Sequence, residues 1–348
     1  MKNKHINIPI FIPHLGCPNN CVFCNQRYIS GVSEFDPESV IPIIEASLAT
    51  APLNSEIEIA FFGGSFTGID RDLMVKLLSI SKSYLDIGKI NSVRCSTRPD
   101  YIDDEIISIL LKYGMTTVEL GLQSSLDHVL LASGRGHTRE DEVKACRLIK
   151  ASGMRLGGQM MIGLPGSCVS DEIETAEFIV SMGCDEARIY PTVVFKNTEL
   201  CNMAINGAYT PLALDDACRR SAAALDVLYK GNVRILRIGL CESENLRSDE
   251  TYFAGPNHPA LGELVENEYY YSLIKDKLNY NNVKNKLLYV FVAPGAVSKA
   301  VGQNRVNKHR ILREYGCSDV KFRESSDVSG YDVLLKTEER KKNVLKVT

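Results

Sequence analysis

The sequence predicts an α/β fold in which parallel strands alternate with helices. Apolar, strand-like runs are followed by helical patterns six or seven times in succession, which is typical of a parallel sheet. The strand segments are continuously apolar, which indicates that both faces of the sheet are covered. The chain has 348 residues, of which 45% are hydrophobic, so one large domain and one small domain can each bury a core.

The predicted elements of the large domain are short and regularly spaced. The predicted strands are Ile6–Ile12, Glu56–Phe62, Val93–Thr97, Thr117–Leu122, Arg155–Ile162, Glu186–Tyr190 and Val233–Gly239. The predicted helices are Pro37–Thr50, Asp70–Leu85, Asp103–Tyr113, Arg139–Ser152, Asp171–Met182 and Ala213–Tyr229. Three residues that favour helix N-termini stand at helix starts, namely Asp70, Asp103 and Thr138. Three glycines stand where helices end, namely Gly114, Gly153 and Gly183.

Two architectures fit this alternation. In a curved or partly closed barrel, the functional residues lie on the loops that follow the strands. The rival is an open, doubly wound sheet. The strand and helix pattern alone does not separate them.

The pattern changes after about Cys241. A loop rich in Ser, Asn, Gly and Pro is followed by a helix, a strand, a helix and two strands. These are predicted at Leu261–Leu278, Leu287–Val292, Ala296–Tyr315, Val320–Arg323 and Asp332–Lys336. We therefore expect a large domain over residues 1–245 and a small α+β domain over residues 246–348.

Composition excludes several classes of protein. With 40 basic and 43 acidic residues, the net charge of −3 argues against a globally positive, nucleic-acid-coating surface, although a local patch stays open. No apolar run reaches the ~18–20 residues of a membrane span, and the polar start shows no secretory signal. We therefore expect a cytoplasmic protein, in which the 11 cysteines are buried thiols or metal ligands rather than disulfides.

A cysteine-rich loop follows the first predicted strand. Cys17, Cys21 and Cys24 lie within eight residues, and Cys95 is the next cysteine along the chain. Three thiolates on one loop can hold three corners of a [4Fe–4S] cluster and leave one iron open to a small molecule. The alternative is a Cys₃His zinc site with His14 as the fourth ligand.

This loop resembles the signature of the radical S-adenosylmethionine (SAM) superfamily, with Phe23 before its last cysteine. Gly63-Gly64-Ser65 resembles the Gly-Gly-Glu turn of that superfamily, with Ser65 in place of the glutamate. The resemblance implies a partial (β/α)₆ TIM-like barrel with the cluster on the three cysteines. It also implies that SAM chelates the fourth iron and that carbonyls of the glycine turn accept from its ammonium group.

The resemblance also assigns contacts to SAM in later strands. Glu119 and Gln123 are implied as partners of the ribose and methionine groups, and Arg135 as the partner of the SAM carboxylate. A guanidinium binds a carboxylate through two parallel hydrogen bonds, which suits that role. The segment that includes Gln159, Ile162 and Gly163 is implied to lie against adenine.

Within the superfamily, residues 5–270 resemble the branch of the Elongator catalytic subunit. The segments that carry this likeness are Phe62–Thr67, Arg135–Thr138, Ile189–Thr192, Leu236–Leu240 and His258–Glu266. The sequence shows no counterpart of that subunit's RNA-contacting N-terminal extension or acetyltransferase domain, so acetyl transfer is not expected to carry over. The resemblance implies reductive cleavage of SAM to a 5′-deoxyadenosyl radical, which abstracts hydrogen from an unidentified substrate. The electron donor is expected to be a flavodoxin or a ferredoxin.

The C-terminal segment suggests an RNA contact. Residues 298–310 resemble the turn and helix of a KH-type RNA-binding module, which we place at about residues 287–336. Four basic residues there are candidate contacts to tRNA, namely Lys299, Arg305, Lys308 and Arg310. Arg305 replaces the second glycine of the module's GxxG loop. Two other hypotheses stay open: a small molecule or peptide as substrate in the barrel mouth, with Tyr190 on the substrate side, and a non-catalytic iron–sulfur or zinc protein.

Overall fold

The computed structural model describes residues 4–13, 15–17, 21–25, 34–241, 246–278 and 283–339. The chain divides into two compact units. The first comprises residues 1–220 and 227–259, and the second comprises residues 221–226 and 260–348. The compact units thus divide at residue 259, and a domain boundary at residue 245 stays a prediction.

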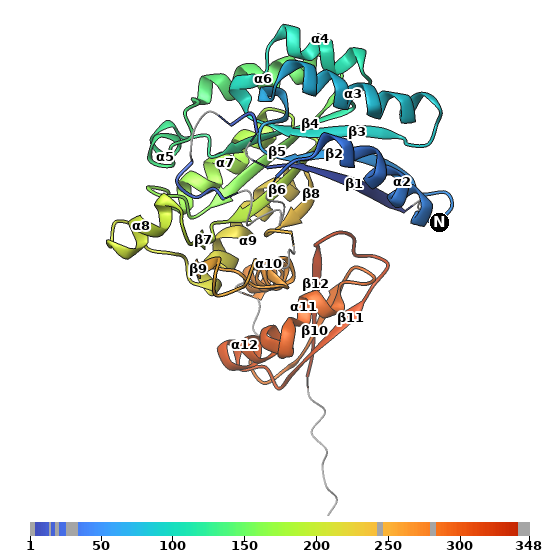
Figure 1. Cartoon of the computed structure of the whole chain (residues 1–348). Coiled ribbons are helices and arrows are strands. Elements are labelled where there is room, and N and C mark those ends of the chain that lie inside the picture. Colours follow the sequence, from blue (N-terminus) through green and yellow to red (C-terminus); the bar gives the residue numbers. More distant parts are fainter. Residues whose placement is uncertain are drawn as a thin grey trace, which may run out of the picture. The chain divides into compact units, whose positions relative to one another are not determined.

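The first unit is built on a seven-stranded sheet in which every pairing is parallel (Figure 1). Its strands, in spatial order, are β1 (His5–Ile12), β2 (Glu56–Gly63), β3 (Ser92–Thr97), β4 (Thr117–Gln123), β5 (Arg155–Ile162), β6 (Glu186–Pro191) and β8 (Arg234–Ile238). Spatial order follows chain order, so each connection is a crossover of the same kind. The sheet curls into a half-barrel, which confirms the predicted barrel-type fold.

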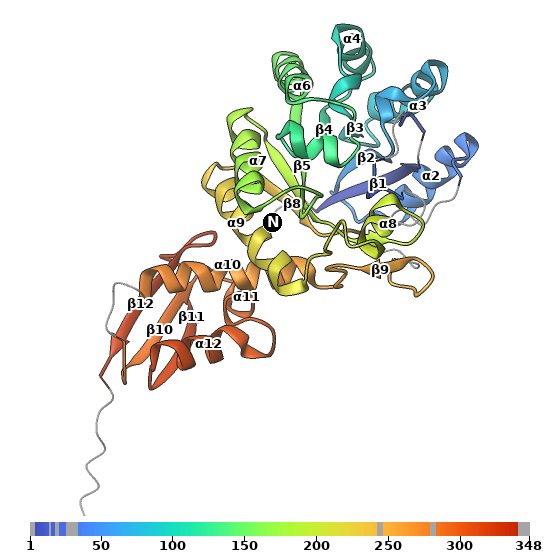
Figure 2. The same cartoon turned by 90° about the vertical axis from the view of Figure 1, so that its left-hand side faces the viewer.

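Helices form the outer layer of this half-barrel (Figure 2). The helices of the first 230 residues are α2 (Val40–Thr50), α3 (Arg71–Asp86), α4 (Asp104–Lys112), α5 (Asp127–Ala132), α6 (Arg139–Ala151), α7 (Val169–Ser181), α8 (Glu199–Ile205) and α9 (Leu214–Lys230). The predicted N-caps are confirmed, because the side chains of Asp70, Asp103 and Thr138 accept from backbone N–H groups of the first turns of α3, α4 and α6.

Alternation along each strand separates the apolar core from a polar interior. In β4, the side chains of Val118, Leu120 and Leu122 are fully buried, and Glu119 and Gln123 occupy the alternate positions. Because successive side chains point to opposite faces, the strands direct apolar residues to the helices and polar residues into the half-barrel. The interior is therefore where the chemistry-bearing side chains gather.

A two-stranded antiparallel sheet completes the first unit. Strand β7 (Val194–Phe195) pairs antiparallel with β9 (Tyr252–Ala254). Strand β9 lies inside the segment after Cys241 that the sequence suggested was a loop. Among the described residues, no helix combines the length and apolar character that crossing a membrane requires.

The second unit packs helices on one face of a three-stranded sheet. Its elements are α10 (Leu261–Leu278), β10 (Leu287–Val292), α11 (Val297–Val301), α12 (Val306–Tyr315), β11 (Asp319–Glu324) and β12 (Val333–Glu338). Strand β10 lies in the centre, parallel to β11 and antiparallel to β12. The buried core includes Ile274, Leu288, Val290, Ala300 and Ile311.

The prediction of one continuous helix over Ala296–Tyr315 is wrong. The chain breaks between α11 and α12, where Gly302, Asn304 and Arg305 have φ angles of 79°, 51° and 59°. A left-handed backbone cannot continue a right-handed helix, and a side chain on Gly302 would lie 2.6 Å from Val306. The break sits at the position of the GxxG-like loop.

Candidate active site

The cysteine loop rests on the turn that ends β2. Strands β1 and β2 are paired in register up to Ile12 and Gly63, so both loops leave the sheet at the same edge. The N–H of Gly64 donates to the Ile12 carbonyl at 2.8 Å, and the N–H of Ser65 donates to the Leu15 carbonyl at 3.3 Å. The parallel pairing therefore brings the predicted cluster loop and the predicted glycine turn together.

The close approach of these two loops requires glycine. A Cβ on Gly64 would lie 2.3 Å from the Leu15 carbonyl oxygen, and a Cβ on Gly16 would lie 2.3 Å from that of Ser65. Gly63 has a φ of 114°, which side chains disfavour. Ser65 is buried, with its Oγ 2.8 Å from Thr97 Oγ1. The serine that replaces the family's glutamate thus ties the turn to β3.

A small cavity of about 110 Å³ lies between these loops. All three predicted cysteines line it, together with Gly63, Gly64, Ser65, Gln123, Arg135 and Gln159. The structure therefore gathers most of the predicted site around one space.

Two arginines face the thiols. Arg135 is buried, and its Nη1 lies 3.4 Å from Cys21 Sγ while its Nη2 donates to the Gly121 carbonyl at 2.5 Å. Arg98 also lines the cavity and pairs with Asp100 at 2.8 Å. Burial raises the pKa of Cys17, against the lowering effects of a backbone hydrogen bond from Ser65 and of both arginines. The arginines therefore favour the thiolate form that metal ligation requires.

Gln123 connects the small cavity to a larger one. It ends β4 at a bulge, with a φ of 71° that is uncommon for a residue with a side chain. Its buried Oε1 has no hydrogen-bond partner among the described residues. A strained backbone and an unpaired buried acceptor, both facing a cavity, are typical of a ligand-binding position.

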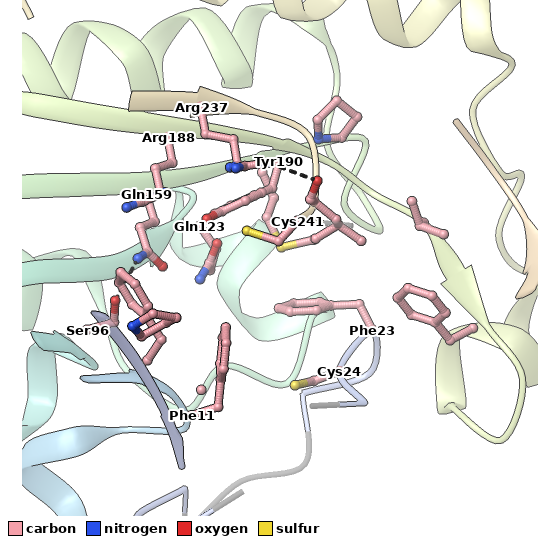
Figure 3. A pocket seen from close by; sticks show the side chains of 18 of the residues that line it. Phe11, Phe23, Cys24, Ser96, Gln123, Gln159, Arg188, Tyr190, Arg237 and Cys241 are labelled. Carbon is pink, nitrogen blue, oxygen red and sulfur yellow. Dashed lines mark hydrogen bonds between the residues drawn. The ribbon is translucent and has the colours of Figure 1, made fainter. Parts of the chain in front are cut away.

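The larger cavity has a volume of about 450 Å³ and occupies the interior of the half-barrel (Figure 3). Its aromatic lining residues are Phe11, Phe23, Phe62, Tyr190 and Phe195. Its main polar lining residues are Ser96, Gln123, Gln159, Arg188, Arg237 and Cys241. The two cavities share Phe23, Cys24, Gly63, Ser96, Gln123 and Gln159, so they adjoin.

Glu119 lies in neither cavity lining, although it was predicted to contact SAM. Its side chain is 1% exposed, and its carboxylate accepts from Arg94 Nη1 at 2.6 Å, Arg188 Nε at 2.6 Å and Gln159 Nε2 at 3.1 Å. Burial alone would raise the pKa of Glu119, but the hydrogen bond from Arg188 and the charges of Arg188 and Arg94 outweigh it and lower the pKa. The structure places Glu119 beneath the larger cavity, where it holds Arg188 and Gln159.

Two of the predicted adenine contacts, Ile162 and Gly163, also lie outside both linings. Ile162 is fully buried. The N–H of Gly163 donates to Glu172 at 2.6 Å, and its carbonyl accepts from Tyr209 at 2.7 Å. Of that segment, Gln159 is the predicted residue that reaches the cavities.

The sequence analysis missed Arg188 and Arg237. Arg188 is anchored by Glu119, whereas Arg237 forms no ion pair among the described residues. The available signal was the alternation Glu186-x-Arg188-x-Tyr190, because it places two charges and a phenol on one face of a buried strand. Tyr190, predicted for the substrate side, does line the larger cavity, and burial raises its pKa.

The basic residues predicted to contact tRNA are largely neutralised within the second unit. Lys299 pairs with Glu266 at 2.8 Å, and Lys308 pairs with Asp319 at 2.8 Å. Arg310 pairs with Glu268 at 2.5 Å and stacks on Tyr271 at 3.4 Å from the ring centroid. Arg305 is exposed. This helical face therefore offers less positive charge than its sequence indicates.

The donor set in the small cavity suits a polynuclear cluster. His14, the fourth ligand of the zinc alternative, lies outside the described residues. Within the described part, no three His, Cys, Asp or Glu side chains converge as the ligands of a single ion do. In a cubane cluster each thiolate bonds a different iron, so the three sulfurs surround a larger group.

Comparisons with known proteins agree with this geometry. Residues 11–179 match the model of the radical SAM superfamily, and residues 184–271 match that of the radical SAM C-terminal domain. The chain belongs to the radical SAM superfamily. The cofactors of radical SAM enzymes are a [4Fe–4S] cluster and SAM. The chain's residues fit both, through three thiols that line one cavity and an unpaired acceptor on Gln123 beside them.

The chain spans less than half the length of the curated relatives described here. The chain is 34% identical over 203 residues to a tRNA uridine(34) acetyltransferase of Methanocaldococcus infernus, covering 53% of this chain and 38% of that protein. It is 28% identical over 181 residues to human Elongator complex protein 3, covering 46% and 33%. The structure of archaeal Elp3 from M. infernus, with an N-terminal deletion, matches with a TM-score of 0.62 and 24% identity over 80% of this chain and 64% of that one. The last likeness shows the shared fold.

Proposed function

We propose that this radical SAM enzyme cleaves SAM reductively and abstracts hydrogen from a substrate in the larger cavity. The observation that carries this proposal is the pair of adjoining cavities, one lined by three thiols and the other a space of about 450 Å³ inside the half-barrel. When bound, the reduced cluster and SAM together supply a 5′-deoxyadenosyl radical.

The chain's own residues bind the cofactors, orient SAM and the substrate, and shield the reactive species from water. Cys17, Cys21 and Cys24 would hold the cluster, and Arg135 offers its guanidinium to a carboxylate at the same place. Gln123 offers an unpaired amide oxygen to a donor group of SAM or substrate. The aromatic walls exclude water from the interior, which protects a reactive species from side reactions.

The proposed substrate is tRNA. Two observations support this choice: the relatives include tRNA uridine(34) acetyltransferases, and the larger cavity is lined by aromatic rings on which a base can stack. Arg237 forms no ion pair among the described residues and is available to a phosphate. Acetyl transfer itself is not part of the proposal.

A small molecule or peptide is the second candidate. It is favoured by Arg237 on the wall of the larger cavity, because a guanidinium binds a substrate carboxylate as readily as a phosphate. A flavodoxin or ferredoxin as electron donor, and a cytoplasmic location, stay predictions.

The test is 5′-deoxyadenosine formation by anaerobically reconstituted protein with SAM and a reductant, with and without bulk tRNA. The variant Cys17→Ala serves as the control. Cleavage that tRNA stimulates supports the tRNA proposal, and cleavage indifferent to tRNA directs the search to small molecules and peptides. No cleavage by protein whose cluster is verified by iron and sulfide content would refute the proposed activity.

A further inference from the structure

The three-stranded sheet of the second unit has two unlike faces. On the inner face, Leu288, Val290 and Val292 of β10 are fully buried in the core that the helices cover. The alternate residues, Tyr289 and Phe291, point to the opposite face and are only half-buried. The outer face therefore presents two aromatic rings on its central strand.

The two rings form one platform. Their centroids lie 6.2 Å apart and their planes differ by 19°. The two rings are nearly parallel and, two residues apart on one strand, stand side by side on the outer face of the sheet. Such a surface suits planar groups that arrive from solvent, because every nucleobase has a π-face that can stack on it.

Cations flank the platform on both neighbouring strands. The register places Lys321 and Lys336 on either side of Tyr289, and Arg323 beside Phe291. The ammonium of Lys321 lies 5.8 Å from the Tyr289 centroid, and that of Lys336 lies 5.4 Å from the Phe291 centroid. All three cations are exposed, and within the described ranges none forms an ion pair.

The carboxylates of this face lie at one end. Glu338 stands opposite Leu287, at the start of β10, and Asp319 stands opposite Leu287 on the other side. Asp319 is held by Lys308 at 2.8 Å. The part of the face around Tyr289 and Phe291 therefore combines aromatic rings with net positive charge, unlike the ion-paired helical face.

We propose that this outer face, defined by Tyr289, Phe291, Lys321, Arg323 and Lys336, binds single-stranded RNA. Bases stack on the two rings while the three cations contact phosphates. Duplex RNA hides the faces of its bases, so the platform favours an unpaired segment. The choice of RNA rests on the proposed tRNA function, whereas the need for stacked bases and phosphates rests on the face itself.

The experiment measures RNA binding by the full chain without its cluster. A fluorescein-labelled single-stranded 12-nucleotide RNA, its duplex and the DNA of the same sequence are titrated by fluorescence anisotropy across a series of salt concentrations. Because neither SAM nor cluster is present, the outcome is independent of SAM cleavage. Absence of SAM cleavage with intact RNA binding refutes the proposed reaction alone. SAM cleavage without RNA binding refutes this inference alone.

Two sets of variants separate stacking from charge. Tyr289→Leu and Phe291→Leu keep an apolar side chain and should each weaken binding by roughly tenfold or more, with an unchanged salt slope. The triple variant Lys321→Gln, Arg323→Gln, Lys336→Gln should reduce the slope of log K against log salt by about 2.

The matched control removes the same charge from exposed positions elsewhere, with Lys144→Gln, Lys275→Gln and Lys284→Gln. Circular dichroism verifies the fold of each variant. Equal loss in the control triple, tighter binding of duplex or DNA, or no binding at low salt overturns the inference. Self-association of the chain that the leucine variants abolish, without RNA binding, overturns it in favour of a second copy as occupant.

Discussion

Replacement of Glu119 by glutamine tests whether this residue supports the site or contacts SAM directly. Its carboxylate is 1% exposed and accepts from two arginines at 2.6 Å. Glutamine keeps the shape but removes the charge, so Arg188 loses its buried carboxylate partner, whereas Arg94 keeps Glu58 and Glu186. Removing one partner of a buried ion pair costs about 3–5 kcal/mol. For a unit of this size we expect a fall in Tm of roughly 10 °C.

The matched control is Glu105→Gln. Glu105 also pairs with an arginine, Arg71, but the distance is 3.3 Å and the Glu105 side chain is 71% exposed. Solvent screens such a pair, so its loss should cost less than about 1 kcal/mol. Urea unfolding of both variants and the wild type, without cluster, gives the two free-energy differences directly.

The effect should depend on pH. The pKa of Glu119 is lowered in the folded state, so its stabilising contribution is present above its unfolded pKa and disappears as pH falls through the folded value. The difference between wild type and Glu119→Gln should therefore shrink in acid. An unfolding free energy equal to that of Glu105→Gln, combined with weaker SAM binding, would refute this reasoning and restore Glu119 as a direct SAM contact.

Three further outcomes are expected. Cys24→Ser should abolish iron binding and the visible absorbance of the cluster, whereas Cys168→Ser, at an exposed thiol, should leave both unchanged. Gly64→Ala places a Cβ 2.3 Å from a backbone carbonyl of the cysteine loop, so SAM binding measured by calorimetry should weaken at least tenfold while the unfolding midpoint moves little. Glu142 is buried, and burial raises its pKa well above the ordinary value, so the wild type loses stability as pH rises above ~4.5. In urea unfolding, the free energy of unfolding of Glu142→Gln should therefore increase relative to that of the wild type between pH 5.5 and pH 8. The same free-energy difference between the two proteins at both pH values would contradict this. Burial, with the charges of two arginines, lowers the pKa of its partner His137 to about 3, so that residue stays neutral throughout this range.

Local signals in the sequence predicted most of the fold. Strand β5 and helix α10 have the predicted ends, because apolar periodicity and turn residues define such elements locally. The helix over Ala296–Tyr315 was wrong because only tertiary packing fixes a left-handed backbone at Asn304 and Arg305. Gly302 was the local sign of a break, whereas Arg305, also in the left-handed region, gave none.

Parallel strand pairing explains why several predicted site residues lie together. The cysteine loop and the glycine turn follow paired strands, so their meeting follows from parallel topology. The position of Glu119 could not be predicted, because its partners Arg94 and Arg188 come from strands 25 and 69 residues away. Charges paired across such distances look the same in a sequence as charges that face a ligand.

The incomplete closure of the half-barrel has a consequence for substrate size. Strands β1 and β8 are the two ends of the sheet, and among the described residues no ladder of hydrogen bonds joins them. In a closed barrel the strand ladder fixes the diameter. Here Phe11 on β1 and Arg237 on β8 line the same cavity from opposite edges of a seam (Figure 3). The seam can widen without the loss of any strand pairing, so a reactive group can reach the interior while the rest of a larger molecule stays outside.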